Sequence, residues 1–431
     1  MKTLIHPLCI SVLSCALVAV RGNAQSEIGI PAGFHVIEGD HLRLISDMPD
    51  QAELSQLVQC FEVAMDHWGN LLDVPRQEAA GWKCTAYLML DRKRFEQSGL
   101  LPDSLPLFPY GFQYGDRIWV TEQPSAYYRR HLLLHEGTHW FMWRKYGGMG
   151  PPWLMEGMAE WLATHRWEAS EQRLEMGIIP RDKEEVPYWG RIKIIQDQLA
   201  EGLAPSLEDI LRYDGTAHQR VDAYAWSWAA VLFLSQHPDS RGAFRQMLGG
   251  SLKPDATNTR AFFRRLHARW PALRTAWRLW ISDLDYGADA SRMLLQLPDC
   301  KPLRLPATVT IDVSQGWQAS GLCLPPGARI RLTAEGRFTV ANEPRPWVCT
   351  ADGVTLEYYR GRPLGQLIAA IVAPQAQESP HTEPVSTIAV GAGTVLPSAN
   401  GGQLILRINE ATGSLHDNRG TITVRINAVD R

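Results

Sequence analysis

Apolar residues recur at helical spacing in several long segments of the chain. Between residues 50 and 72, Leu54, Leu57, Phe61, Met65 and Trp68 are three or four positions apart, which predicts an amphipathic helix. The same spacing, with boundaries set by capping residues, Gly and Pro, predicts further helices. They cover residues 125–146, 153–165, 188–199, 206–211, 221–235 and 260–284.

Alternating apolar and polar positions predict strands in two separate parts of the chain. The first part has strands at 41–46, 85–90 and 118–121, and residues 101–115, rich in Pro, Gly and aromatics, are expected to form a loop. This part is expected to be a small sheet whose edge runs beside a substrate cleft. Beyond residue 298, short alternating runs such as 328–333, 403–408 and 421–426 lie between Gly, Pro and Asn residues. The expected fold class is therefore α+β, with a mixed sheet and a helical subdomain followed by an antiparallel β-sandwich.

The first residues of the chain have the pattern of an export signal. Lys2 precedes an apolar run from 4 to 20, and small residues, Gly22 and Ala24, stand before a cleavage site at Gln25. The run is too short for a comfortable membrane span. We expect a signal peptide at 1–24 and an exported protein, periplasmic or extracellular, without a transmembrane anchor. A lipoprotein signal ending at Cys15 is the weaker alternative, because the apolar segment continues past it.

Five cysteines remain after the signal peptide, and an oxidising compartment permits disulfides. Their positions suggest a Cys60–Cys84 bridge, and one pair plus one free thiol among Cys300, Cys323 and Cys349. The formal net charge of −3 gives no indication of a nucleic-acid partner. Tryptophan occurs 16 times, and helix packing is the favoured interpretation over a binding groove.

The candidate chemistry lies in the stretch from His135 to His139. Two histidines four residues apart share one face of a helix, so both imidazoles can reach one metal ion. Glu136, between them, can handle the proton of a metal-bound water. Glu156, the first acidic residue after His139, is the natural third ligand. Glu160 shares a helix face with Glu156, and its carboxylate can accept the outer N–H of a ligand histidine.

Two further histidines stand near these motifs. His131 is four residues before His135, so spacing alone also allows a metal at that pair. No glutamate follows His131, and the Glu156 stretch matches the later pair. We therefore interpret His131 as a helix-face histidine without a metal, and give His165 the same interpretation.

The sequence HEGTH followed by WLMEGMAEW resembles the gluzincin metallopeptidases, and most closely the peptidase-MA-like group of secreted proteins. The resemblance covers roughly residues 40 to 285. It implies a zincin-like catalytic domain, expected at 25–297, in which His135, His139 and Glu156 bind one catalytic zinc ion. It also implies that Glu136 is general base and then general acid toward zinc-bound water. The Gly-x-Met-Glu-Asn loop of the aminopeptidases in this clan is absent, which favours an endopeptidase.

Tyr224 occupies the position of a conspicuous tyrosine in related sequences. Its phenol could donate a hydrogen bond to the oxyanion of a peptide-hydrolysis intermediate. A tyrosine that only packs in the core is nearly as well supported by the sequence.

The C-terminal stretch from 402 to 420 resembles the calcium-dependent, galactose-binding bacterial lectins of the PA-IL type. The resemblance implies a galactose-binding-like β-sandwich at 298–431. Its calcium-ligand positions correspond to Glu410, Ser414, Asp417 and Asn418, all of which carry oxygen. An Asp-Asn-x-Gly turn also explains this stretch without any ligand.

The function expected from these features is that of a secreted zinc metallopeptidase acting on protein or peptide substrates. Its accessory domain would bind a glycan or a cell-surface ligand, with calcium as a second cofactor. Two alternatives remain open. One is a carbohydrate- or surface-binding protein whose peptidase-like domain is inactive. The other is a zinc hydrolase of non-peptide substrates, because zinc and a glutamate do not by themselves select the bond.

Overall fold

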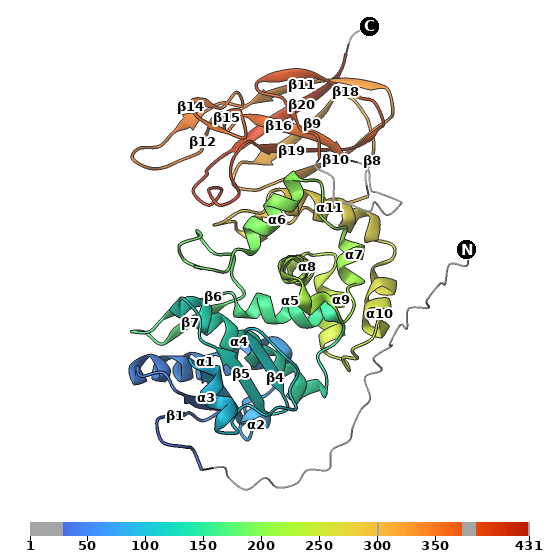
Figure 1. Ribbon diagram of the computed structural model, residues 1–431. Coiled ribbons are helices and arrows are strands. Elements are labelled where there is room, and N and C mark those ends of the chain that lie inside the picture. Colours follow the sequence, from blue (N-terminus) through green and yellow to red (C-terminus); the bar gives the residue numbers. More distant parts are fainter. Residues whose placement is uncertain (1–28, 300, 373–384, 430–431) are drawn as a thin grey trace, which may run out of the picture.

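The computed structural model describes residues 29–299, 301–372 and 385–429, and its fold is α+β. Figure 1 shows a small sheet with helices at one end of the molecule, a helical part in the middle and a β-rich part at the other end. The predicted fold class is therefore confirmed. The predicted signal peptide at 1–24 and Cys300 lie outside the described residues. The domain boundaries near 25 and 298 stay predictions.

The first part is a five-stranded mixed sheet in the order β1-β2-β3-β5-β4. Its strands are β1 (His35–Glu38), β2 (Leu42–Ser46), β3 (Cys84–Met89), β4 (Gly111–Tyr114) and β5 (Arg117–Thr121). The three central strands are parallel, and the edge strands β1 and β4 are antiparallel to their neighbours. The expectation of a loop throughout 101–115 was wrong at β4. Pairing with β5, which local sequence does not reveal, makes this short segment a strand.

Two long helices of this part were predicted almost to the residue. They are α1 (Gln51–Leu72) and α4 (Ala126–Tyr146), and the short helices α2 (Arg76–Ala79) and α3 (Arg92–Gln97) accompany them. The side chain of Asp50 caps α1, and the hydroxyl of Ser125 accepts from the N–H of Tyr128 at the start of α4. Phe61 and Trp68 of α1 and Phe141 of α4 are buried in the shared core.

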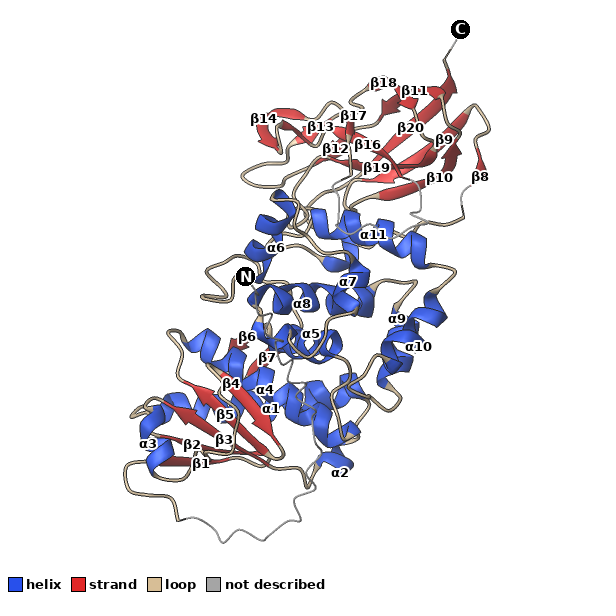
Figure 2. Ribbon diagram, turned by 45° about the vertical axis from the view of Figure 1, so that its right-hand side comes forward, coloured by secondary structure: helices blue, strands red, loops and turns tan. Residues whose placement is uncertain are grey.

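Helices form the middle of the molecule, where Figure 2 shows them between the two groups of strands. They are α5 (Pro152–Ala163), α6 (Arg191–Ala200), α7 (Leu207–Leu211), the 3-10 helix η1 (Ala217–Gln219), α8 (Val221–Gln236), α9 (Arg241–Leu248), α10 (Thr257–Leu266), α11 (Trp270–Ser282) and α12 (Ala290–Met293). A hairpin of β6 (His165–Glu168) and β7 (Arg173–Met176), which was not predicted, follows α5.

The single helix predicted at 260–284 is two helices. The chain breaks between α10 and α11, and Pro271 stands in the first turn of α11. Proline lacks an N–H and fits a first helical turn but not a helix interior, so it starts a new helix here. The tryptophans of this region, including Trp226, Trp228 and Trp277, are buried, as the core-packing interpretation predicted.

The C-terminal part contains two larger sheets that share a buried core, as the predicted β-sandwich requires. One has the order β17-β16-β19-β10-β8, and the other has the order β18-β11-β20-β9. The strands are β8 (Lys301–Pro302), β9 (Ala307–Asp312), β10 (Gln318–Leu324), β11 (Ala328–Glu335), β16 (Leu367–Val372), β17 (Ile388–Ala389), β18 (Gly393–Ser398), β19 (Gly402–Ile408) and β20 (Thr421–Ala428). Two small hairpins join β12 (Phe338–Thr339) to β13 (Val348–Cys349) and β14 (Val354–Tyr359) to β15 (Arg362–Leu364).

A polar cluster ties α11 to the sandwich. Asp283, the C-cap residue of α11, accepts from Trp317 Nε1 at 3.0 Å and from Arg360 Nη1 at 2.8 Å. It also forms an ion pair with the buried guanidinium of Arg407. A small apolar cluster surrounds this junction and joins Leu279 and Leu297 to Trp317, Ile368 and Ile405 among others. The helical part and the sandwich are therefore packed together through a buried interface.

The predicted Cys60–Cys84 bridge was wrong. Both cysteines are free thiols buried in the core between α1 and the sheet. Burial raises the pKa of Cys60 to about 12 and that of Cys84 well above its usual value, so neither thiol is reactive there. Cys323 is disulfide-bonded and Cys349 is free, as one pair plus one free thiol requires.

No helix in the described ranges combines the length and the apolar character that a membrane crossing needs.

Candidate metal centre

Helix α4 presents the two histidines of the HEGTH stretch one turn apart. The Nε2 atoms of His135 and His139 lie 3.1 Å apart, and both side chains are buried. Trp68 of α1 donates from Nε1 to Thr138 at 3.0 Å, on the neighbouring face of α4. The segment that carries the histidines is therefore bound to α1 through Thr138.

Helix α5 supplies the acidic groups. It begins at Pro152 and packs closely on α8, because a Cβ atom at Gly157 would lie 2.5 Å from the carbonyl oxygen of Ser227. A glycine at this position brings α8 into contact with α5. The same helix directs Glu156 and Glu160, which are only 5% and 2% exposed, toward α4. Neither glutamate is a solvated surface residue.

Three ligand atoms converge between the two helices. Oε2 of Glu156 lies 3.3 Å from Nε2 of His135 and 3.5 Å from Nε2 of His139. Tetrahedral coordination with bonds of about 2.0–2.1 Å separates ligand atoms by about 3.3 Å. The observed separations of 3.1, 3.3 and 3.5 Å match that value. Oε2 of Glu156 is buried without a hydrogen bond, so a cation would satisfy it. The residues present fit a zinc ion.

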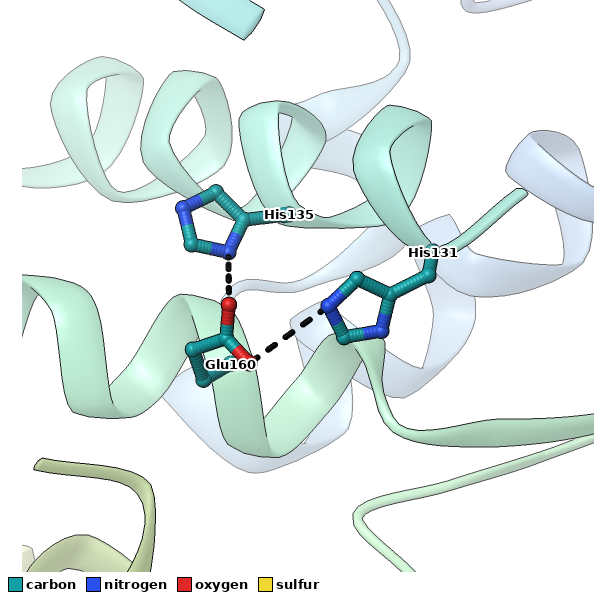
Figure 3. A group of neighbouring side chains, drawn as sticks. All are labelled: His131, His135 and Glu160. Atoms are coloured by element: carbon teal, nitrogen blue, oxygen red, sulfur yellow. Dashed lines mark ion pairs between the residues drawn. The ribbon is translucent and has the colours of Figure 1, made fainter. Parts of the chain in front are cut away.

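A second group, His131, His135 and Glu160, also brings three ligand atoms together (Figure 3). The carboxylate of Glu160 lies between the two rings, 3.3 Å from Nδ1 of His135 and 3.5 Å from Nε2 of His131. The guanidinium of Arg191 already occupies this carboxylate, donating from Nε at 3.0 Å and from Nη2 at 3.1 Å. A buried cation at that distance repels a metal ion, so this group is better suited to orienting His135.

The histidines and carboxylates of the site shift one another's pKa values. Burial disfavours the imidazolium of His135, but the carboxylates of Glu156 and Glu160 outweigh it and raise the pKa of His135 to about 10. Burial alone would raise the pKa of Glu156, yet its close contacts with His135 and His139 lower that pKa to about 2. A metal-ligating histidine must be neutral, so a metal ion bound here would displace the proton of His135.

Glu136 lies at the edge of the sheet. A Cβ atom at Gly111, the first residue of β4, would fall 2.4 Å from Oε1 of Glu136. Only a glycine leaves room for the carboxylate in this position. Burial raises the pKa of Glu136, while His135 and His139 lower it, and the net shift is upward. A raised pKa favours a carboxyl group that accepts and releases a proton near neutral pH.

Tyr224 of α8 lies beside the histidines. Its ring centroid is 5.9 Å from that of His135. Burial, followed by the negative charges of Glu156 and Glu136, raises the pKa of its phenol, which therefore keeps its proton. The structure thus brings Tyr224 together with the other residues singled out in the sequence.

Two residues of the site, Arg191 and Gly111, were not recognised in the sequence. Arg191 belongs to no motif and reaches Glu160 only through the fold. Gly111 lies within the segment read as a loop. His131 is completely buried, with Nδ1 2.9 Å from the carbonyl oxygen of Ala163, and the interpretation that it holds no metal stays a prediction. His165 is buried as well.

The predicted calcium residues of the C-terminal part do not form one shared environment. Glu410 and Asn418 are buried, and Asn418 Nδ2 donates to Oε2 of Glu410 at 2.7 Å, whereas Ser414 is exposed. Thr412 in the same loop donates to the carbonyl oxygen of Asp283 at 2.9 Å. The loop therefore packs against the end of α11. Calcium binding at Glu410, Ser414, Asp417 and Asn418 stays a prediction.

Comparison with known proteins gives little beyond this geometry. No protein-family model matches the chain, and no curated protein matches it. One solved structure, described as "EclA N-terminal domain; PllA-like lectin", is similar to 28% of this chain over 95% of its own length. The identity is 18% and the TM-score is 0.22, which is too low to support an argument about fold or function.

Proposed function

We propose that this protein is a zinc metallopeptidase. The observation that carries the proposal is the convergence of His135 Nε2, His139 Nε2 and Glu156 Oε2 at separations of 3.1 to 3.5 Å, next to Glu136. Two histidines and a glutamate are a ligand set of catalytic zinc, which keeps a further position open. When bound, zinc supplies a Lewis acid and brings the pKa of a coordinated water to about 7.

Glu136 is the proton carrier in this proposal. It is buried beside the ligand histidines, and its pKa is raised, so it can take the proton of the attacking water. The same carboxyl group then delivers that proton to the leaving nitrogen of the cleaved peptide bond. Because Gly111 has no side chain, the carboxylate of Glu136 fits beside β4.

Tyr224 is proposed as the hydrogen-bond donor to the developing oxyanion. Its neutral phenol lies next to His135, and the negative charges around it favour the protonated form. A donor of this kind lowers the barrier by about 3 kcal/mol in related chemistry.

The position of the edge strand β4 favours a peptide substrate over other classes of substrate. β4 is terminal in its sheet and begins at Gly111, against the carboxylate of Glu136. An extended peptide can pair with an edge strand through main-chain hydrogen bonds, which places its carbonyl groups along the metal centre. Because no amine-anchoring motif is present in the sequence, we propose cleavage at internal bonds.

A digest of a proteome-derived peptide library tests the proposal. The wild-type protein is expected to cleave internal bonds, and Glu136→Gln is expected to retain zinc and lose cleavage. Equal activity of the two proteins would remove Glu136 from the mechanism. A zinc-loaded wild type that cleaves no peptide but hydrolyses small esters or amides would favour the non-peptide alternative. A role of the sandwich in binding glycans or cell surfaces stays a prediction.

A further inference from the structure

Arg191 is a buried cation where α6 meets three other helices. It opens α6, and its side chain contacts residues of α4, α5 and α8. It donates hydrogen bonds to Glu160 on α5 and to the phenol oxygen of Tyr128 on α4. On α8 the ring of Tyr224 lies 5.7 Å from its guanidinium carbon. Arg191 therefore contacts both the residue that orients His135 and the proposed oxyanion donor.

The two hydrogen bonds to Glu160 define the rotation of its carboxylate. Nη2 donates to Oε1, the oxygen that lies 3.3 Å from Nδ1 of His135. Nε donates to Oε2, the oxygen that lies 3.5 Å from Nε2 of His131. A planar guanidinium holds both oxygens at once, so the carboxylate cannot turn without breaking a bond.

The orientation of His135 depends on that rotation. Glu160 contacts Nδ1, and Nε2, on the opposite side of the ring, faces Glu156 and His139. A partner on the outer nitrogen fixes both the tautomer and the direction of a ligating imidazole. His131, stacked on Tyr128 with an interplanar angle of 7°, closes the other side of Glu160.

We infer that Arg191 is the positioning residue of the metal centre, acting on His135 through Glu160 and on Tyr224 through its ring. It does not itself supply a metal ligand. The inference rests on the proposed function for the location of the metal, but metal binding can be measured without turnover.

The chain offers a matched control in a second buried arginine–glutamate pair. Arg274 of α11 is 9% exposed and bonds to Glu208, which is 3% exposed and also accepts from Trp270. Arg191 is 7% exposed. Substitution of Arg274 therefore also removes a buried guanidinium that is paired with a buried glutamate. Neither Arg274 nor Glu208 belongs to the metal centre.

The test uses full-length Arg191→Met and Arg191→Lys with Arg274→Met as the control. Zinc affinity is measured by competition with a chelator, and the cobalt-substituted proteins are compared by their visible absorption spectra. We expect Arg191→Met to bind zinc about 10- to 100-fold more weakly and to show an altered cobalt spectrum. Arg191→Lys, which keeps the charge without the fork, is expected to stay impaired. Arg274→Met is expected to lose stability but to keep wild-type affinity and spectrum.

The outcomes separate the inference from the proposed function. If the Arg191 variants match Arg274→Met in affinity and spectrum, Arg191 is only structural and the inference is overturned. Should Arg191→Met fail to fold, Arg191→Lys decides the question by the same two readouts. If the wild-type protein binds no metal through His135 and His139, the proposed function and the inference are both overturned.

Discussion

Gly111 and Glu136 are in direct steric contact: a Cβ atom added to Gly111 would lie 2.4 Å from Oε1 of the glutamate. The contact joins the edge strand β4 to the helix that carries the histidines. Gly111→Ala is therefore expected to displace the carboxylate and to reduce kcat/KM for a peptide by about 100-fold. Zinc content is expected to stay at the wild-type level.

Gly81→Ala is the matched control, because a Cβ atom at Gly81 meets no atom within 4 Å. Steady-state kinetics on one peptide and metal analysis of all three proteins give the answer. Undiminished turnover of Gly111→Ala would show that the position of Glu136 is unimportant for the reaction.

Because Asp283 at the end of α11 pairs with Arg407 of the sandwich, we expect this contact between the two parts to contribute to the stability of the protein. Asp283→Ala leaves the guanidinium of Arg407, which is 2% exposed, buried without its carboxylate. Breaking a buried ion pair in this way costs about 3–5 kcal/mol, so the free energy of unfolding in urea is expected to fall by that amount.

Glu335→Ala provides the comparison, since its ion pair with Arg425 lies on the surface of the sandwich. Exposed pairs contribute about 0–1 kcal/mol, so this variant is expected to unfold almost as the wild type does. Equal losses in the two variants would mean that the junction adds no stability of its own.

Glu410 predicts a pH dependence of stability. Burial raises its pKa from 4.5 to about 7, and the hydrogen bond from Asn418 offsets only part of that effect. Because the folded state favours the protonated form, the stabilising contribution of that proton is complete below pH 4.5. It is lost as the pH rises to about 7, with a total of up to about 3 kcal/mol. Glu410→Gln is therefore expected to raise Tm relative to the wild type at pH 8 and to have little effect at pH 4.5.

Thermal unfolding at the two pH values checks this prediction, and a variant less stable than the wild type at pH 8 would contradict it. The same assay addresses the predicted calcium site. A rise in Tm with calcium in the wild type, absent in Glu410→Gln, would confirm that Glu410 binds the ion.

Metal binding should itself depend on pH. The pKa of His135 is raised to about 10, so below that pH its proton must leave before the ring can bind a metal. Affinity is therefore expected to rise about tenfold per pH unit between pH 6 and pH 8. Chelator competition at these pH values measures the slope, with the protonation of the chelator taken into account. A pH-independent affinity would show that no proton is displaced at the site.

The parts of this site that local sequence determines were predicted. Helical periodicity places His135 and His139 on one face, and capping by Ser125 marks the start of their helix. The position of Glu156 follows from its place in the next helix. By contrast, β4 becomes a strand through pairing with β5, and Arg191 reaches Glu160 across 31 positions of sequence. Contacts of this kind depend on tertiary packing and leave no local pattern.

The error in the predicted disulfide has a similar cause. Cys60 and Cys84 were expected to form a bridge because they are close in sequence and the compartment is oxidising, yet both are core residues of separate elements. Nothing near His131 in the sequence indicates its partner either, because Glu160 comes from another helix.

The most direct test of the central claim is an anomalous difference map from a zinc-soaked crystal, recorded at the zinc absorption edge. The account predicts one strong peak at about 2.0–2.2 Å from His135 Nε2, His139 Nε2 and Glu156 Oε2. The absence of a peak there, or a peak between His131, His135 Nδ1 and Glu160 instead, would contradict it.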